Sequence, residues 1–231
     1  MLGPDVEIDI DAIDEPNTRV DIPKLIQHFR RHENFGLLAL VGVQSNQYPR
    51  ALDIARPFRA AGIQVAMGGF HFSGCLAMLD GRAIDLDQAR AAGISLFAGE
   101  AEGRFDDFLR DAAAGKLRPL YNYMEDFPAI NDVPPPFLPR KFVRRTLGNN
   151  TSFDAGRGCP FQCSFCMIIN VQRRKSRHRS PGDIEKDRAA KLGAEDLPLF
   201  HHRRQFRNGF PLSRGRAALD AWSMTAPHLQ C

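Results

Sequence analysis

Short apolar runs alternate with helical patterns through the first half of the 231-residue chain, and this alternation leaves few possible architectures. The predicted strands are residues 37–43, 63–67 and 94–98, with an alternating edge strand at 6–10, and the predicted helices are 22–31, 49–60 and 105–114. Strands that alternate with helices at this interval are typical of a parallel sheet with helices on its faces. The sequence therefore predicts an α/β fold with a Rossmann-like N-terminal sheet.

Polar or glycine-rich loops follow three of these predicted strands at their carboxyl ends. In parallel sheets, ligands bind beyond these ends, and glycine there permits positive φ and close approach of a ligand to the backbone. The candidate binding residues are Ser45, Gly68, Gly69, His71, Gly99 and Glu100. Ordinary turn chemistry between strand and helix explains the same composition, so both interpretations stay open.

A change of composition divides the chain after the last predicted helix. Residues 116–140 are rich in proline and lack a clear periodicity, which predicts an extended linker because proline fixes φ. The predicted organisation is an α/β domain at 1–115, the linker at 116–140, a second domain at 141–192 and an irregular tail at 193–231.

Charge and hydropathy exclude several classes of protein. The chain carries 31 Lys and Arg against 27 Asp and Glu, yet residues 140–216 contain 18 against 6. A basic stretch raises the possibility of nucleic acid, but no interleaved aromatics or nucleic-acid motif accompany it, so we do not expect nucleic acid as a partner. No apolar run approaches the roughly 20 residues of a membrane helix, and no signal sequence is evident. We expect a cytoplasmic protein that does not bind a membrane.

Three of the five cysteines lie within eight residues, at Cys159, Cys163 and Cys166. Their spacing is too tight for one helix face, so a loop is expected to carry them around a metal. Three ligands and one open position suit an iron–sulfur cluster that binds another molecule at its fourth iron. A structural zinc site normally takes a fourth protein ligand, and that alternative remains open. The conceivable donors are Cys75, Cys231, His178, His201 and His202, none of them at a zinc-finger spacing.

The cysteine segment resembles the signature of the radical S-adenosylmethionine (radical SAM) superfamily, including the aromatic Phe165 directly before the last cysteine. The resemblance implies that Cys159, Cys163 and Cys166 bind a 4Fe-4S cluster whose unique iron chelates S-adenosylmethionine. Reduction by a donor such as flavodoxin or ferredoxin then cleaves the sulfonium bond, giving methionine and a 5′-deoxyadenosyl radical. The backbone around Phe165 is expected to contact the adenine.

The N-terminal half is similar to the cobalamin-binding domain that precedes one large radical SAM branch. The matching segments are Val41–Ser45, Tyr48–Ala51, Gly68–His71 and Gly99–Gly103, together with the proline-rich linker. Many such domains supply a histidine ligand in Asp-x-His-x-x-Gly, and that triplet is absent here. The resemblance instead places His71 near the nucleotide tail of cobalamin. It also implies a domain that is either complete or without its first βα unit.

The C-terminal part departs from the family pattern. A radical SAM barrel needs several more βα units after the cysteine loop, but residues 193–231 lack periodicity of either kind. Phe200 to Phe206 reads Phe-His-His-Arg-Arg-Gln-Phe, and its codons read one base later permit Phe-Ile-Thr-Asp-Asp-Asn-Phe, a strand sequence typical of this branch. The hypothesis is a frameshift between about Lys186 and Phe200, with the tail out of frame and only the first unit of the barrel present.

The sequence thus predicts a radical SAM enzyme, or a fragment of one, of the cobalamin-dependent type and with an unknown substrate. The implied cofactors are a 4Fe-4S cluster, S-adenosylmethionine and cobalamin. Two alternatives remain: a non-catalytic cobalamin-binding module or inactive truncated product, and a structural zinc protein.

Overall fold

The structure is a computed structural model that describes residues 8–15, 18–33, 35–79, 82–133 and 155–192. The chain divides into a first unit of residues 1–128 and 164–171 and a second unit of residues 129–163 and 172–231. The beginning of the predicted second domain and the whole predicted out-of-frame tail lie outside the described residues.

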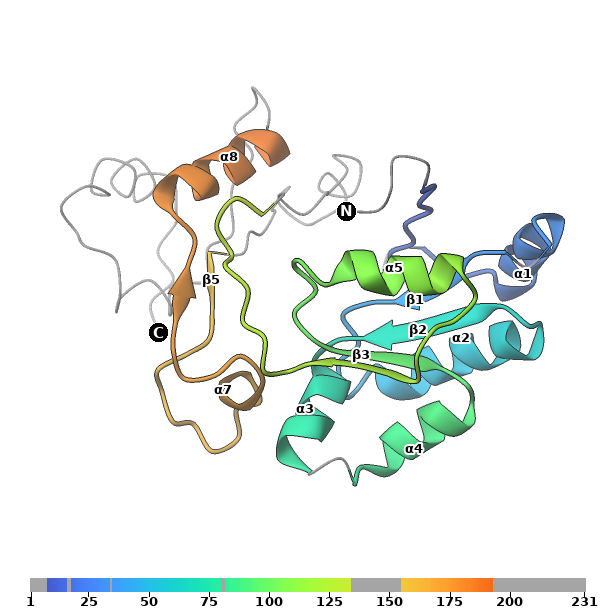
Figure 1. Cartoon of the computed structure of the whole chain (residues 1–231), viewed down its shortest axis with the longest axis horizontal. Helices are drawn as coiled ribbons and strands as arrows, with labels where there is room; N and C mark the ends of the chain where they lie inside the picture. The colour runs from blue at the N-terminus through green and yellow to red at the C-terminus, as the bar shows by residue number, and fades with distance from the viewer. Residues whose placement is uncertain (1–7, 16–17, 34, 80–81, 134–154, 193–231) are drawn as a thin grey trace. The chain divides into compact units, whose positions relative to one another are not determined.

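The first unit is built on a four-stranded parallel sheet (Figure 1). Its strands are β1 (Leu37–Leu40), β2 (Gln64–Gly68), β3 (Ser95–Gly99) and β4 (Leu120–Tyr123), in the spatial order β1-β2-β3-β4. The register pairs Leu38 with Val65 and Met67 with Leu96. This Rossmann-like α/β architecture confirms the fold class predicted from the alternation of apolar runs and helical patterns.

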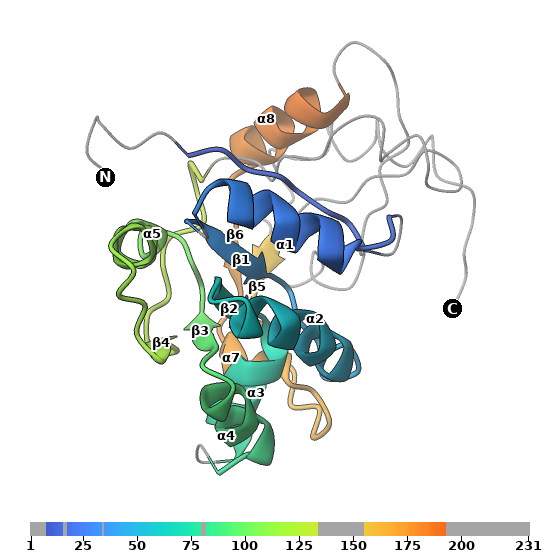
Figure 2. The same ribbon diagram turned by 90° about the vertical axis from the view of Figure 1, so that its right-hand side faces the viewer.

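Helices cover both faces of the sheet (Figure 2). They are α1 (Ile22–Arg31), α2 (Tyr48–Ala60), α3 (Phe70–Met78), α4 (Ile84–Ala91) and α5 (Phe105–Ala113). The larger core joins α2, α3 and α4 to side chains such as Val65 and Met67, with α1 packed at its margin. On the opposite face, Ala66 packs with Phe108 of α5, because successive strand residues point to opposite faces.

Two expectations about the ends of this unit need correction. The predicted edge strand at 6–10 is wrong where it is described, since Ile8 and Ile10 are exposed and lie in irregular structure. The stretch expected to be a linker begins with a strand, because β4 pairs in parallel with β3 and buries Tyr121. Helices α3 and α4 were not predicted from the sequence. Helix α2 was predicted, and it continues through Pro57 as far as Ala60.

The described part of the second unit contains a short antiparallel pair and a helix. Strand β5 (Gly156–Arg157) pairs with β6 (Arg177–His178), and α8 (Pro181–Leu192) follows. Ser180 caps α8, since its Oγ accepts from the Asp183 N–H at 3.1 Å.

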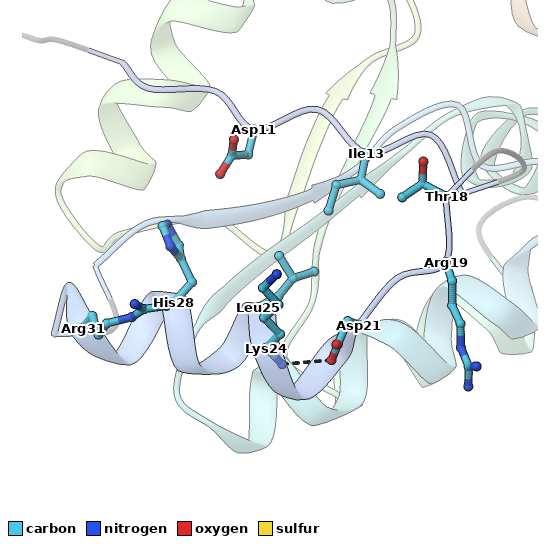
Figure 3. A pocket seen from close by; sticks show the side chains of 9 residues that line it. All are labelled: Asp11, Ile13, Thr18, Arg19, Asp21, Lys24, Leu25, His28 and Arg31. Atoms are coloured by element: carbon cyan, nitrogen blue, oxygen red, sulfur yellow. Dashed lines mark hydrogen bonds between the residues drawn. The ribbon is translucent and has the colours of Figure 1, made fainter. Parts of the chain in front are cut away.

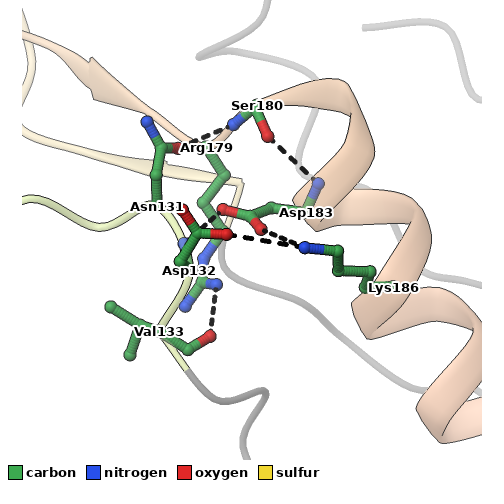
Figure 4. A network of polar contacts seen from close by, with 7 residues as sticks. All are labelled: Asn131, Asp132, Val133, Arg179, Ser180, Asp183 and Lys186. Carbon is green, nitrogen blue, oxygen red and sulfur yellow. Dashed lines mark hydrogen bonds and ion pairs between the residues drawn. The ribbon is translucent and has the colours of Figure 1, made fainter.

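A network of polar contacts holds the start of α8 against the segment that precedes residue 134 (Figure 4). The N–H of Asp132 donates to the Asp183 carboxylate at 2.7 Å, and the N–H of Ser180 donates to Asn131 Oδ1 at 2.8 Å. Arg179 is almost fully buried and donates from Nη1 to the carbonyl oxygen of Val133 at 3.2 Å.

Over the described ranges, no helix combines the length and apolar character required to cross a membrane.

Candidate functional site

The carboxyl edge of the sheet gathers side chains from three loops around a buried histidine. His71 stands in the first turn of α3 and is only 5% exposed. Its Nδ1 lies 3.2 Å from the hydroxyl of Ser45, in the loop after β1. Its Nε2 lies 3.2 Å from a carboxylate oxygen of Asp85, a distance suited to an ion pair, although the alignment is not that of a hydrogen bond. The predicted residues Ser45 and His71 are therefore brought together.

Tyr48 completes this cluster, and no sequence pattern indicated that it would contact His71. The two rings stack with centroids 4.6 Å apart and an interplanar angle of 24°. The phenol oxygen lies 3.0 Å from the carbonyl oxygen of Asp85 and 3.0 Å from Gln88 Oε1, either of which can accept its proton. Tyr48 and Asp85 come from different helices, so only the tertiary fold places them at this histidine.

Burial sets the protonation of both rings. It lowers the pKa of His71, an effect that the nearby Asp85 carboxylate opposes. It also raises the pKa of Tyr48 to about 12, and Asp85 adds to that rise. At neutral pH the cluster is therefore a neutral imidazole stacked on a neutral phenol beside one carboxylate.

Gly69 joins the first two loops of this edge. It has φ +139°, and a Cβ there would lie 2.6 Å from the carbonyl oxygen of Val43. The Val43 N–H donates to Gly68 O, and the His71 N–H donates to Val43 O, both at 3.0 Å. Glycine at this position is thus required by a close approach of the chain to itself.

Gly99 has the same function at the third loop. Its φ is +97°, and a Cβ would lie 2.6 Å from the carbonyl carbon of Tyr123. Its N–H donates to the hydroxyl of Ser73 on α3 at 3.1 Å, a contact that the sequence did not indicate. The predicted binding residues Ser45, Gly68, Gly69, His71 and Gly99 therefore meet at one edge, with Glu100 following directly. Binding of a ligand there stays a prediction.

The cysteine segment is irregular from Cys159 to Cys166, as the tight spacing of the three thiols predicted. Cys163 is exposed, Cys159 and Cys166 are partly exposed, and all three are free thiols. Three thiolates are the donor set that a cluster with one open iron requires. The described residues contain no group of three or more His, Cys, Asp or Glu side chains placed to hold a metal ion, and the ligand roles of the three thiols stay a prediction.

The backbone at the start of this loop is held by the segment that follows α7 (Ile168–Val171). Gly158 has φ +79°, and its N–H donates to Gln172 Oε1 at 3.3 Å. The Cys159 N–H donates to the carbonyl oxygen of Arg173 at 3.2 Å. Phe165 is 88% exposed, which leaves it accessible to a ligand such as the adenine that it was predicted to contact.

A separate cavity of about 260 Å³ lies between α1 and the segment that precedes it (Figure 3). Its lining residues are Asp11, Ile13, Thr18, Arg19, Asp21, Lys24, Leu25, His28 and Arg31. Asp21 is engaged there as the N-cap of α1, accepting from the Lys24 N–H at 3.1 Å. None of the residues predicted from the sequence lines this cavity.

Comparison with known proteins identifies a distant homologue. The chain is 31% identical over 163 residues to bacteriochlorophyllide d C-8(2)-methyltransferase from Chlorobaculum tepidum. The matched region covers 67% of this chain and 34% of the relative, so the chain spans about a third of the length of the curated relative it matches. No family model matches the chain. No solved structure matches it either. The chain is thus related to a methyltransferase.

Proposed function

We propose that this chain is a radical SAM protein of the cobalamin-dependent type, with methyl transfer as its class of reaction. The Cys-x3-Cys-x2-Cys loop carries the proposal, because three thiolates leave one iron of a 4Fe-4S cluster open. Its place after a Rossmann-like unit supports the same assignment, as does the similarity to a methyltransferase. The substrate is outside the proposal.

Cys159, Cys163 and Cys166 are the proposed cluster ligands, and the backbone at Phe165 is the proposed adenine contact. Cys159, Cys163 and Cys166 would hold the cluster, and a bound cluster reduced by a flavodoxin or ferredoxin would supply the electron that splits S-adenosylmethionine into methionine and a 5′-deoxyadenosyl radical. The exposure of Cys163 and Phe165 leaves this loop open to such ligands.

Cobalamin is proposed to bind at the carboxyl edge of the sheet. The loops there are tied together by Gly69 and Gly99, which gives a ligand a preorganised backbone surface. His71 is buried, and Ser45 and Asp85 lie beside its two ring nitrogens. It is therefore suited to holding the loops in place rather than to ligating cobalt, in keeping with the missing Asp-x-His-x-x-Gly triplet.

Anaerobic reconstitution of the full chain with iron and sulfide tests the cluster. We expect about four iron and four sulfide per chain, with the broad visible absorbance of an iron–sulfur cluster. Replacing Cys163 by Ala should abolish iron retention, because one thiolate ligand is lost. Cys75→Ala is the matched control, since that thiol is buried in α3, and it should retain iron. Colourless protein with stoichiometric zinc would establish the structural zinc alternative instead.

Titration with hydroxocobalamin, followed by absorbance and equilibrium dialysis, tests the other half of the proposal. We expect saturable binding of one cobalamin per chain, weakened by Ser45→Trp because Ser45 is exposed at the proposed edge. Lys24→Trp is the control at the separate cavity and should leave the affinity unchanged. The absence of saturable binding by the unmodified chain would refute the cobalamin assignment.

A further inference from the structure

Helix α3 is buried on more than one side. His71, Phe72, Ser73, Gly74 and Cys75 form a continuous buried run, which an amphipathic surface helix does not show. Phe72 and Cys75 belong to the core formed with the sheet. A second element must therefore cover another side of this helix.

That element is α7 (Ile168–Val171), which packs against α3 within the first unit (Figures 1 and 2). Met167, directly before α7, lies against Gly74. A Cβ at Gly74 would overlap Met167 Sδ and would lie 2.9 Å from its Cγ and 3.1 Å from its Cε. Glycine is among the least favourable residues inside a helix, and the space taken by Met167 gives a physical reason for it here.

The start of α7 fixes the residues on both sides of Met167. The N–H groups of Asn170 and Val171 donate to Met167 O at 3.1 and 3.0 Å. The side-chain amide of Asn170 donates to the carbonyl oxygen of Cys166 at 3.4 Å. Ile169 and Val171 are buried, which anchors the short helix. Cys166 is therefore held by a turn that packs on α3.

We propose that Gly74 is a positioning residue, forming a notch in α3 that takes Met167 and thereby fixes Cys166 to the α/β unit. The same helix carries His71 and Ser73, which order the carboxyl edge of the sheet. The helix thus couples the third cysteine to that edge. A role of this coupling in cofactor binding rests on the proposed function. The packing of Met167 on Gly74 is independent of that function.

The test compares the alkylation rates of individual cysteines by mass spectrometry in the full chain without metal. Met167 ends in flexible atoms that can rotate away from a methyl group, so Gly74→Leu is the informative change. We expect the ratio of the Cys166 rate to the Cys163 rate to rise at least about threefold, because the turn is released from α3. Ala77→Leu, at an exposed position of the same helix, should leave the ratio unchanged.

A second variant tests the contact between Met167 and Gly74 if Gly74→Leu disturbs the fold. Buried Cys75 reports on the helix itself and should stay slow to react in a folded variant. Met167→Ala should also raise the Cys166 ratio, and the Gly74→Leu/Met167→Ala pair should restore it, since a leucine then fills the space. An unchanged Cys166 ratio in Met167→Ala, with Cys75 still protected, would overturn the proposal.

Iron retention after reconstitution separates this inference from the proposed function. If the unmodified chain retains no iron, the proposed cluster fails while the alkylation rates still decide the role of Gly74. If the unmodified chain retains a cluster, Gly74→Leu should lose it faster in the presence of a chelator than Ala77→Leu does. Equal rates of iron loss together with equal alkylation ratios would contradict the positioning role.

Discussion

At the scale of single residues, His71 shows how burial determines chemistry. Its imidazole stacks on Tyr48, with Ser45 at one nitrogen and the Asp85 carboxylate near the other. Burial lowers its pKa against the opposing influence of Asp85, so the folded protein holds the ring in its neutral form. A neutral ring keeps one nitrogen as an acceptor, which suits a partner hydroxyl.

This protonation predicts a pH dependence of stability. In the unfolded chain His71 takes up a proton below about pH 6.5, whereas in the folded chain it does so only at lower pH. The unfolded state then binds more protons, so the free energy of unfolding should fall as pH falls from about 6.5, by at most about 1.4 kcal/mol per pH unit. Urea unfolding at a series of pH values should show this slope reduced in His71→Gln. An unaltered slope in His71→Gln would contradict the assignment.

Gly69 makes a second prediction at this scale. Its φ of +139° and ψ of −176° lie in a region that is almost exclusive to glycine, and a Cβ would meet the backbone of Val43. Gly69→Ala should lower the free energy of unfolding by about 3 kcal/mol or more. Gly62→Ala, with φ +79° and no atom within 4 Å of its Cβ, should cost only about 1 kcal/mol. Urea denaturation of the two variants measures the difference, and equal losses would argue against the close approach.

At the scale of elements, β4 shows where sequence patterns are insufficient. Its residues Leu120 to Tyr123 alternate too briefly to indicate a strand, and prolines surround them. The strand forms because Tyr121 is buried against Phe108 and donates its hydroxyl to the Asp111 carboxylate at 2.7 Å. Arg118 Nε adds a contact with the same carboxylate at 2.9 Å.

Tyr121→Phe tests this anchor. The hydrogen bond from Tyr121 is the largest cause that holds the pKa of Asp111 below its usual value, followed by the bond from Arg118. Loss of the bond from the buried hydroxyl should lower the free energy of unfolding at pH 7 by about 1 kcal/mol. Because the folded pKa of Asp111 is depressed, its contribution is lost as pH falls below about 3.9, so the variant and the wild type should converge in acid. Tyr123→Phe on the same strand is the control, and a constant difference down to low pH would contradict the pairing.

The elements that the sequence predicted are those with strong apolar patterns. Strands β1, β2 and β3 are continuous apolar runs, and α1, α2 and α5 show helical spacing of their apolar residues. Helix α3 was missed because burial on more than one side removes its periodicity, and its first residues read as a glycine-rich loop. The residues at the carboxyl edge of the sheet could be predicted only in part, because some of them are brought there by tertiary packing. Loop position indicates Ser45 and His71, but only the packing of separate helices brings Tyr48 and Asp85 to them.

At the scale of the whole molecule, the predicted shift of the reading frame falls between about Lys186 and Phe200. Residues 200–206 lie outside the described residues, and the proposal of a shifted reading frame rests on their codons. Sequencing the gene should show bases that read Phe-Ile-Thr-Asp-Asp-Asn-Phe one position later, followed by an open frame with further strand and helix patterns. A gene in which the shifted frame closes at once would contradict the proposal.

We propose that Cys159, Cys163 and Cys166 hold a 4Fe-4S cluster with one iron open to S-adenosylmethionine. The most direct measurement is Mössbauer spectroscopy of the full chain reconstituted with ⁵⁷Fe, recorded before and after addition of S-adenosylmethionine. We predict that about one quarter of the iron changes its spectrum on addition, because one iron of four lacks a thiolate ligand. Four unchanged iron sites, or a chain that retains no iron, would contradict the account.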